Sequence, residues 1–330
     1  MILSVLRFAR RLGKWLLWPW IYLALQFTAR AIKLLPNEHI GGKVFARQGY
    51  HLLRKYYGAP IPDESDLTGA FWDQASEMVG LHMNDQTALD LLDTVIRRYL
   101  DEFRNCFPNH RTSDPKMFYL LNSNYMAVDA HVYYSMIRHF QPKRIIEIGA
   151  GNSTVLAAAA GQQNQVETGR APHLIAIEPY PRSFVKEGFP GLSQLISEKV
   201  QDVTLECFKS LGAGDILFID SSHVLRSGGD VQYEYLEILP RLNPGVLIHI
   251  HDISLPKPYP RVYFEQQQYW NEQYLLQAFL AFNSRFEVLW AGNYMAIRYP
   301  QKIDEVFPEL ALMRQNFPDA HPSAFWMRAR

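Results

Sequence analysis

Cysteine is scarce in this chain of 330 residues. Only Cys106 and Cys207 occur, so the sequence implies no disulfide framework and suits a reducing compartment. The chain also has no C-x-x-C, H-E-x-x-H or G-x-S-x-G pattern and no phosphate-binding loop. Zinc sites, serine hydrolases and nucleotide-hydrolysing enzymes therefore lack support. Repeats and low-complexity tracts are absent as well, and 48% hydrophobic residues suffice for one large core with helical additions.

Acidic residues are almost missing from the first 55 positions. That stretch carries ten Lys or Arg residues and one acid, Glu38, whereas the remaining positions carry 23 basic and 32 acidic residues. The net charge of zero therefore hides an excess of nine positive charges in the first part and nine negative charges in the rest. Long uncharged runs are missing too. Residues 15–29 contain no charge, but they are fewer than the ~20 residues that span a bilayer, and Pro19 should kink a helix there.

The uncharged run at residues 15–29 carries three tryptophans and a tyrosine, which suit the headgroup level of a membrane, and basic residues flank it. We therefore predict that residues 1–35 attach a cytoplasmic protein to a membrane surface, peripherally or monotopically. The alternative is an apolar helix that packs on the catalytic domain or on another subunit, which leaves a homo-oligomer open. A cleaved signal peptide lacks support because Arg30 follows Ala29 directly. Nucleic acid is not an expected partner because the basic residues form no run.

The most informative stretch covers residues 144–154. Its isoleucines predict a buried strand, which passes Glu147 and ends in a glycine turn. Gly149 and Gly151 allow a ligand to approach the backbone because they have no Cβ. The polar residues at 152–154 supply an N-cap for the helix that follows. The pattern predicts a small molecule bound over the turn.

Two nucleotide-type cofactors use such a turn. A dinucleotide site requires a third glycine where this chain has Thr154, and a strand-ending acid about twenty residues further on. The next strand-ending acid here is Glu178, which comes too late. By contrast, an acid two residues before the first glycine, Glu147, suits a ligand with a positively charged amino group. S-adenosylmethionine carries such a group, so we predict S-adenosylmethionine rather than NAD as the cofactor.

Further apolar runs alternate with helical stretches along the chain. Strands are expected at residues 173–178, 195–200, 215–220 and 245–252, and helices at 230–239 and 267–282. This alternation predicts an α/β fold with a doubly wound, mostly parallel sheet. Ligands bind outside the carboxyl ends of such strands. Acids fall at four of these ends, namely Glu147, Glu178, Asp220 and Asp252.

A terminal β-hairpin is expected from residues 286–291 and 294–299, joined by a Gly-Asn pair. Such a hairpin on a parallel sheet resembles the sixth and seventh strands of class I S-adenosylmethionine-dependent methyltransferases. More narrowly, the chain resembles a bacterial group of these enzymes through I-E-P-Y-P at 177–181, G-D-I-L-F-I-D-S-S-H at 214–223, H-D at 251–252 and W-N-E-Q-Y-L-L at 270–276. The resemblance covers about residues 120–300. It extends distantly to sugar, macrolide and catechol-type O-methyltransferases.

The resemblance implies roles for particular residues. Those expected around S-adenosylmethionine are Glu147, Gly149, Gly151, Asn152, Ser153, Glu178, Gln201, Asp202 and Asp220, with Glu178 on the ribose and Gln201 or Asp202 near the adenine. The expected catalytic residues, around the transferable methyl group, are Asp220, His223, His251 and Asp252. Methyl transfer needs positioning and removal of the acceptor's proton, a task that suits histidine. His223 or His251 is therefore the expected general base, whereas His249 is expected to be an interior histidine.

A divalent metal such as Mg²⁺ is the alternative to a histidine base, because a metal lowers the pKa of a bound hydroxyl. In the related O-methyltransferases, an aspartate after the fourth strand and an acidic or amide pair after the fifth strand hold the metal. Asp220 and Asp252 match the first two of these and are the expected metal ligands. Ile253 stands in the second position of the pair and cannot ligate. His223 and water would have to complete the site.

These observations divide the chain into a basic, aromatic anchor (1–35), a helical cap region (36–140), a cofactor-binding catalytic domain (141–300) and a helical tail (301–330). The predicted function is S-adenosylmethionine-dependent methylation of a hydroxyl on a sugar, a glycolipid or a secondary metabolite, so the acceptor is a small molecule, a glycan or a lipid-linked compound. Transfer to nitrogen or to a carboxylate is the enzymatic alternative. A non-catalytic membrane-associated scaffold is the rival from another class. Within this picture Asp129 is expected to cap a helix, and Glu272 to lie at a solvated helix start.

Overall fold

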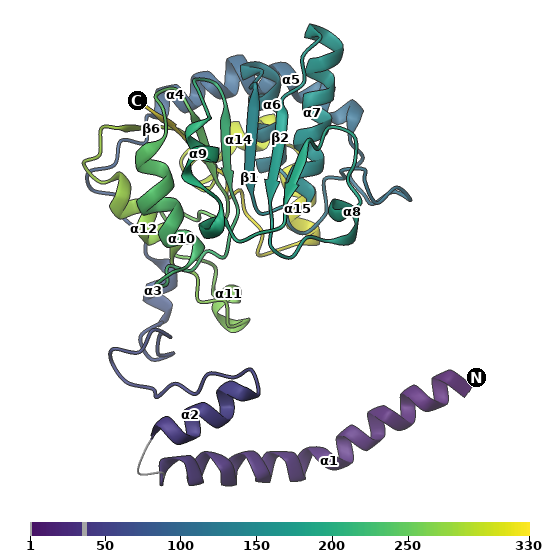
Figure 1. Ribbon diagram of the computed structural model, residues 1–330, viewed down its shortest axis with the longest axis vertical. Coiled ribbons are helices and arrows are strands. Elements are labelled where there is room, and N and C mark those ends of the chain that lie inside the picture. Colours follow the sequence, from purple (N-terminus) through teal and green to yellow (C-terminus); the bar gives the residue numbers. More distant parts are fainter. Residues whose placement is uncertain (1, 35–37) are drawn as a thin grey trace. The chain divides into compact units, whose positions relative to one another are not determined.

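The computed structural model describes residues 2–34 and 38–330, and the chain forms two compact units, one reaching to Glu64 and one from Ser65 to Arg330. In the first unit, α1 (Ile2–Lys33) is followed by α2 (Glu38–Arg47). Pro19 lies inside α1, which continues through it and is bent (Figure 1), as expected for a helix that contains a residue without an N–H. Within residues 2–34 and 38–330, no helix is both long and apolar enough to cross a membrane.

The second unit is built on a seven-stranded sheet (Figure 1). Its strands are β1 (Arg144–Ile148), β2 (His173–Ile177), β3 (Gln194–Ile196), β4 (Ile216–Ile219), β5 (Leu247–Ile250), β6 (Phe286–Ala291) and β7 (Phe325–Ala329). They lie in the order β3-β2-β1-β4-β5-β7-β6. The first five strands pair in parallel, and β7 pairs antiparallel with both β5 and β6. The predicted α/β class and the doubly wound, mostly parallel seven-stranded sheet are confirmed.

The register of the parallel strands brings their carboxyl ends to one level. Ile148, the last residue of β1, pairs with Ile177 of β2 and with Ile219 of β4, and Ile219 pairs with Ile250 of β5. Each of these strands is therefore followed immediately by residues at the same edge of the sheet. This is the edge where a doubly wound sheet binds its ligands.

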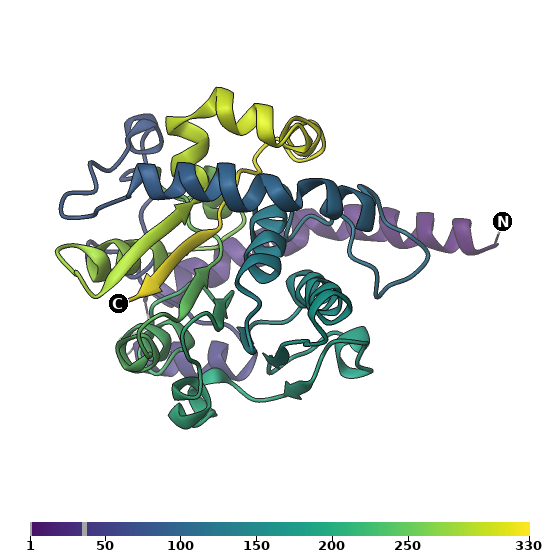
Figure 2. The same ribbon diagram turned by 90° about the horizontal axis from the view of Figure 1, so that it is seen from above.

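Helices cover both faces of the sheet (Figure 2). Side chains alternate along a strand, so Ile145 faces one core and Ile146 the other. The first core includes residues of α4 (Asp85–Asp90), the π-helix η1 (Leu91–Ile96), α5 (Arg97–Cys106), α6 (Asp129–Phe140), α7 (Asn152–Thr168), α13 (Gly292–Arg298), α14 (Pro300–Val306) and α15 (Glu309–Asn316). The second includes residues of η2 (Val200–Asp202), α9 (Leu205–Lys209), α10 (Asp230–Tyr233), η3 (Glu234–Ile238), η4 (Leu239–Arg241) and α12 (Glu272–Leu280). The short helices α3 (Gly69–Asp73), α8 (Ser183–Lys186) and α11 (Arg261–Glu265) complete the second unit.

The predicted β-hairpin at residues 286–299 is wrong. β6 is present, but Gly292–Arg298 form α13, and the antiparallel partner of β6 is β7, which follows two further helices. Gly292 donates its backbone N–H to Ala324 O at 2.8 Å, so the Gly-Asn pair starts a helix beside the incoming β7 instead of a tight turn. The expected helical tail thus contributes a strand to the sheet, and the fold of the second unit continues past residue 300. The helix expected at 267–282 is also shorter, because α12 begins at Glu272.

Candidate active site

The glycine turn lies between β1 and α7, where the sequence predicted it. Gly149 has φ +89°, and a Cβ there would stand 2.1 Å from the backbone oxygen of Asp220. Asp220 in turn donates its N–H to Ile148 O at 2.9 Å, so the ends of β1 and β4 touch at this point. Gly149 is therefore required for strand contact. At Gly151, by contrast, a Cβ would meet nothing within 4 Å, although Gly151 is not among the residues that line either cavity at this edge of the sheet.

The helix after the turn is capped by one of the three predicted residues. Thr154 Oγ1 accepts the backbone N–H of Gly151 at 3.0 Å. Asn152 and Ser153 lie in the first turn of α7. Neither is among the lining residues of the two cavities at this edge of the sheet.

The first cavity, of about 440 Å³, lies at the carboxyl ends of β1, β2 and β4. Of the predicted cofactor residues, Gly149, Glu178, Gln201 and Asp220 line it. Glu178 is fixed in place, because the N–H groups of Tyr180 and Ala150 donate to its two carboxylate oxygens at 2.8 and 3.4 Å. Asp202 is exposed and does not line the cavity, so the structure places Gln201 and not Asp202 on this wall.

Glu147 lies beneath the turn and does not line either cavity. Side-chain alternation in β1 turns it toward the α6 side, where Tyr133 donates to Oε1 at 2.9 Å. Its Oε2 has no hydrogen-bond partner among the described residues. Burial raises the pKa of Glu147 to about 8, against the opposing effect of the nearby Thr154 and Tyr133 hydroxyl groups. The structure therefore gives no direct path from this carboxyl group to a ligand.

The second cavity, of about 480 Å³, adjoins the first and shares Asp220, Ser221 and Ser222 with it. The predicted catalytic residues Asp220, His223, His251 and Asp252 all line it. His223 Nε2 lies 3.3 Å from Asp220 and 3.4 Å from Asp252, and His251 Nδ1 lies 3.5 Å and 3.6 Å from the same two carboxylates. The structure thus brings the four predicted catalytic residues into one cluster.

A buried carboxylate orients His223. Its Nδ1 donates to Glu272 Oε2 at 2.9 Å, and Tyr235 donates to Glu272 Oε1 at 3.1 Å. His223 has φ +58°, and its backbone oxygen accepts hydrogen bonds from the N–H groups of Asn271 and Glu272 at the start of α12. Glu272 is 0% exposed. The prediction of a solvated position for Glu272 is therefore wrong.

The charges of the cluster favour imidazolium–carboxylate pairs. Burial opposes protonation of His223, but hydrogen bonds to Asp220 and Glu272 outweigh burial and raise its pKa well above the ordinary value. Burial likewise opposes protonation of His251, yet Asp252 and Asp220 raise its pKa. Burial also opposes ionisation of Asp220, but the two histidines hold its pKa below the usual range.

His249 is an interior histidine, as predicted. It is buried, its ring centroid lies 4.2 Å from that of Phe218, and neither ring nitrogen has a partner in the described part of the chain. Burial lowers the pKa of His249 well below the ordinary value. Its ring faces the same side as that of His251, at 5.8 Å.

Besides Glu272, three further residues of the site were missed in the sequence, namely Asp129, Ser323 and His321. Asp129 does not cap α6; its buried carboxylate accepts the N–H groups of Ser323 and Ala324 and lies 3.6 Å from His251 Nε2. Ser323 and His321 precede β7 and line the second cavity. Only the position of Asp129 before the glycine strand pointed toward the site. Nothing marked the segment before β7.

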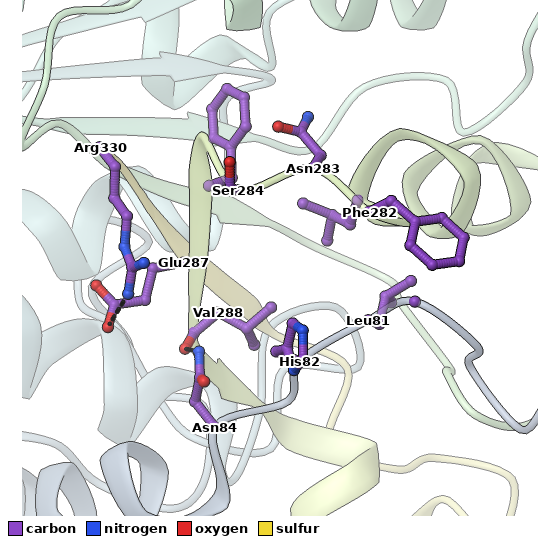
Figure 3. A pocket seen from close by; sticks show the side chains of 12 residues that line it. Leu81, His82, Asn84, Phe282, Asn283, Ser284, Glu287, Val288 and Arg330 are labelled. Atoms are coloured by element: carbon purple, nitrogen blue, oxygen red, sulfur yellow. Dashed lines mark hydrogen bonds and ion pairs between the residues drawn. The ribbon is translucent and has the colours of Figure 1, made fainter.

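A third cavity, of about 590 Å³, lies elsewhere (Figure 3). It is bounded by the first residues of β6 and by Arg330 after β7, at the opposite end of the strands from their shared carboxyl edge. Glu287 forms an ion pair with Arg330 there at 3.1 Å, and Asn84 donates to Val288 O at 3.0 Å. None of the predicted site residues lines this cavity.

Asp220, His223 and Asp252 fit a divalent cation. Each offers one ligand atom, and these atoms lie within 4.8 Å of one another. The donor set combines carboxylate oxygens with one imidazole nitrogen, and the bond from His223 Nδ1 to Glu272 is typical of a histidine whose other nitrogen is a ligand. The cluster consists of the predicted ligands Asp220 and Asp252 together with His223, the residue expected to complete the site.

Comparison with known proteins bears on the segment that carries the glycine turn and the predicted catalytic residues. Residues 146–253 match the model of a family described as a methyltransferase domain. The likeness to a methyltransferase domain applies to this segment of the chain. Residues 146–253 include most of β1 and all of β2, β3, β4 and β5, with the glycine turn and all four predicted catalytic residues.

Individual relatives are more distant. A protein of Archaeoglobus fulgidus without a described function is 31% identical over 142 residues, which are 41% of this chain and 60% of that protein. An O-methyltransferase of Bacillus cereus, solved with SAH, has 14% identity, covers 74% of this chain and 97% of its own, and has a TM-score of 0.33. Phosphoethanolamine N-methyltransferase 2 of Haemonchus contortus, solved with S-adenosyl-L-methionine, has 12% identity, covers 60% of this chain and 52% of its own, and has a TM-score of 0.31. Likenesses this weak leave the acceptor open.

Proposed function

We propose that the protein transfers a methyl group from S-adenosylmethionine to a hydroxyl group of an uncharged, polyhydroxylated acceptor such as a sugar, free or attached to a lipid. The observation that carries the proposal is the junction of two cavities at Asp220, Ser221 and Ser222. A cofactor in the first cavity and an acceptor in the second would meet at this junction. The family match at residues 146–253 supports the methyl-transfer part of the proposal.

The first cavity suits S-adenosylmethionine, which supplies an electrophilic methyl group when bound. The Glu178 carboxylate is held by two backbone N–H groups and can accept hydrogen bonds from both ribose hydroxyls. Gln201 offers an amide for the adenine, and Gly151 leaves room for the amino acid part. Asp220 lies at the junction of the two cavities, where its negative charge would favour the positively charged sulfonium of the cofactor.

His223 is placed to remove the acceptor's proton. Because Asp220 and Glu272 raise its pKa, it acts as a base only in its neutral form, with Nε2 unprotonated. Its Nε2 lines the second cavity, while the Glu272 carboxylate holds Nδ1–H and thereby fixes the tautomer and the ring orientation. Asp252 and His251 stand beside it and can accept or donate hydrogen bonds to the acceptor's other hydroxyls. Asp220, His223 and Asp252 would hold a divalent cation in the same place, which would lower the pKa of an acceptor hydroxyl.

The lining of the second cavity favours a neutral acceptor. In the part of the chain that the structure describes, no Lys or Arg lines it, whereas Asp129, Asp220 and Asp252 do. A carboxylate or phosphate acceptor would face these acids with no Lys or Arg to offset its charge, because His223 and His251 are already paired with Asp220 and Asp252. Trp270 and Tyr263 add two aromatic rings, 4.5 Å apart, and aromatic faces suit the apolar faces of a sugar ring.

Radiolabelled S-adenosylmethionine, offered with a panel of monosaccharides, amines and carboxylic acids, tests the proposal. We expect release of S-adenosylhomocysteine with neutral polyols and a product that resists mild alkali, as a methyl ether does and a methyl ester does not. His223→Ala should lower the rate of release by about 10²- to 10⁴-fold while the variant still binds S-adenosylmethionine. Transfer only to amines or carboxylates would overturn the choice of acceptor. Cofactor binding without any release would favour a scaffold.

A further inference from the structure

The helix α1 exposes a continuous run of apolar side chains. All side chains from Leu17 to Arg30 are exposed, among them Trp18 at 61%, Trp20 at 71% and Phe27 at 75%. Contiguous exposed apolar side chains are rare on a soluble surface and mark an interaction site. The exposed and mostly apolar residues 17–29, called the apolar block below, therefore mark an interaction site.

The uncharged segment at residues 15–29 is too short to span a bilayer. Residues 15–29 are uncharged, and at 1.5 Å per residue they extend about 22 Å, less than the ~30 Å hydrocarbon core of a bilayer. In agreement, no helix among residues 2–34 and 38–330 qualifies as a membrane span. A lipid surface can hold such a segment only with the helix lying along it.

Charge selects the kind of surface. Residues 1–55 carry ten basic residues and one acid, whereas the rest of the chain has an excess of nine acids. Arg30 and Lys33 follow the apolar block directly in α1. Tryptophan and tyrosine occupy the headgroup level of bilayers, and basic residues beside them bind anionic lipids.

We infer that α1 docks the protein in-plane on a membrane surface of anionic lipids. The apolar side chains of residues 17–29 enter the boundary between headgroups and acyl chains, and the flanking basic residues contact lipid phosphates. A second copy of the chain is the competing occupant. A dimer formed through the apolar side chains would not account for the excess of basic residues around them. The dimer is therefore the weaker choice.

Co-sedimentation of the full-length protein with vesicles tests the inference. The probes are vesicles of phosphatidylcholine alone and of equal parts phosphatidylcholine and phosphatidylglycerol. We expect at least about tenfold tighter binding to the anionic vesicles, and weaker binding as salt is added. Trp18→Ser/Trp20→Ser and Arg30→Ala/Lys33→Ala should each weaken that binding by about tenfold.

Matched controls lie in the second unit. Val166→Ser removes another exposed apolar side chain, and Arg111→Ala another base outside the first unit. Both should bind the anionic vesicles as the parent does, and all variants should keep their affinity for S-adenosylmethionine. Equal binding by the tryptophan variant and the parent would overturn the inference. So would the absence of vesicle binding together with a dimer that the Trp18→Ser/Trp20→Ser change dissociates.

Discussion

Glu272 Oε2 lies 2.9 Å from His223 Nδ1, although 49 positions separate the two residues in the chain. The contact joins the segment after β4 to the first residue of α12. Since Glu272 is fully buried and its other oxygen accepts from Tyr235, the carboxylate has little freedom to turn. His223 is consequently held with Nε2 toward Asp220 and Asp252.

Replacing this carboxylate should impair turnover. We expect Glu272→Gln to lower kcat by about 10- to 100-fold, because an amide no longer fixes the proton on Nδ1. The affinity for S-adenosylmethionine, measured by calorimetry, should stay within about twofold. Tyr235→Phe is the matched control, since it removes the hydrogen bond to the other oxygen and leaves His223 paired. If the Glu272→Gln variant were as active as the parent, the contact would be only structural.

Chelation separates the two ways of removing the acceptor's proton. If His223 acts as the base, treatment with EDTA should leave the rate of S-adenosylhomocysteine release unchanged, and His223→Ala should lower kcat by about 10²- to 10⁴-fold. Asp252→Asn is the variant to compare with His223→Ala in the same assay. It removes a neighbouring negative charge, keeps the shape of the side chain and leaves His223 in place. A rate that falls with EDTA and returns with Mg²⁺ or Mn²⁺ would assign the cluster to a cation.

The two glycines of the turn should respond differently to the same substitution. A Cβ at residue 149 would collide with the backbone of Asp220, so Gly149→Ala should lower the free energy of unfolding by on the order of 3 kcal/mol or more. Open space at Gly151 predicts a stability change below about 1 kcal/mol for Gly151→Ala. If the amino acid part of S-adenosylmethionine lies over the turn, as proposed, Gly151→Ala should bind S-adenosylmethionine at least about tenfold more weakly, because the new methyl group would stand in its place. Thermal unfolding and calorimetry measure both effects; equal stabilities of the two variants would contradict this geometry.

The buried carboxyl group of Glu147 should make stability depend on pH. Burial raises its pKa to about 8 in the folded protein, whereas the unfolded chain titrates near ~4.3. The stabilising contribution is therefore complete below the unfolded value and is lost as pH rises toward about 8, because folding then requires the unfolded carboxylate to take up a proton. We expect Glu147→Gln to exceed the parent in stability by on the order of 3 kcal/mol near pH 8 and to match it near pH 4. Parallel stability curves for parent and variant would refute this, and Glu178→Gln serves as the control.

Local signals account for what the sequence predicted correctly. The isoleucines of β1, the glycines after them and the acids at strand ends lie within a few positions of one another, and alternation along the chain is enough to predict a parallel sheet. The motif around Asp220 and His223 and the H-D pair at 251–252 could be placed at one edge for the same reason. Parallel strands in this register end at one level, so residues that follow different strands could be expected to lie close together.

Long-range contacts account for what was missed. Asp129 bonds to Ser323 across 194 positions, and Glu272 bonds to His223 across 49, so no local pattern could reveal either contact. The Gly292-Asn293 pair favours a tight turn by its own chemistry, and β7 overrides it by supplying Ala324 O to Gly292 N. A short run such as Phe325–Ala329 carries no period that separates a central strand from a tail.

Calorimetric titration of the purified full-length protein tests the central claim most directly: that the first cavity binds S-adenosylmethionine. Binding heat should appear with S-adenosylmethionine and with S-adenosylhomocysteine and should be absent with NADH. It should be lost in Glu178→Ala, because this variant lacks the carboxylate proposed to bind the ribose. Binding of NADH without either of the two sulfur nucleosides would contradict the account.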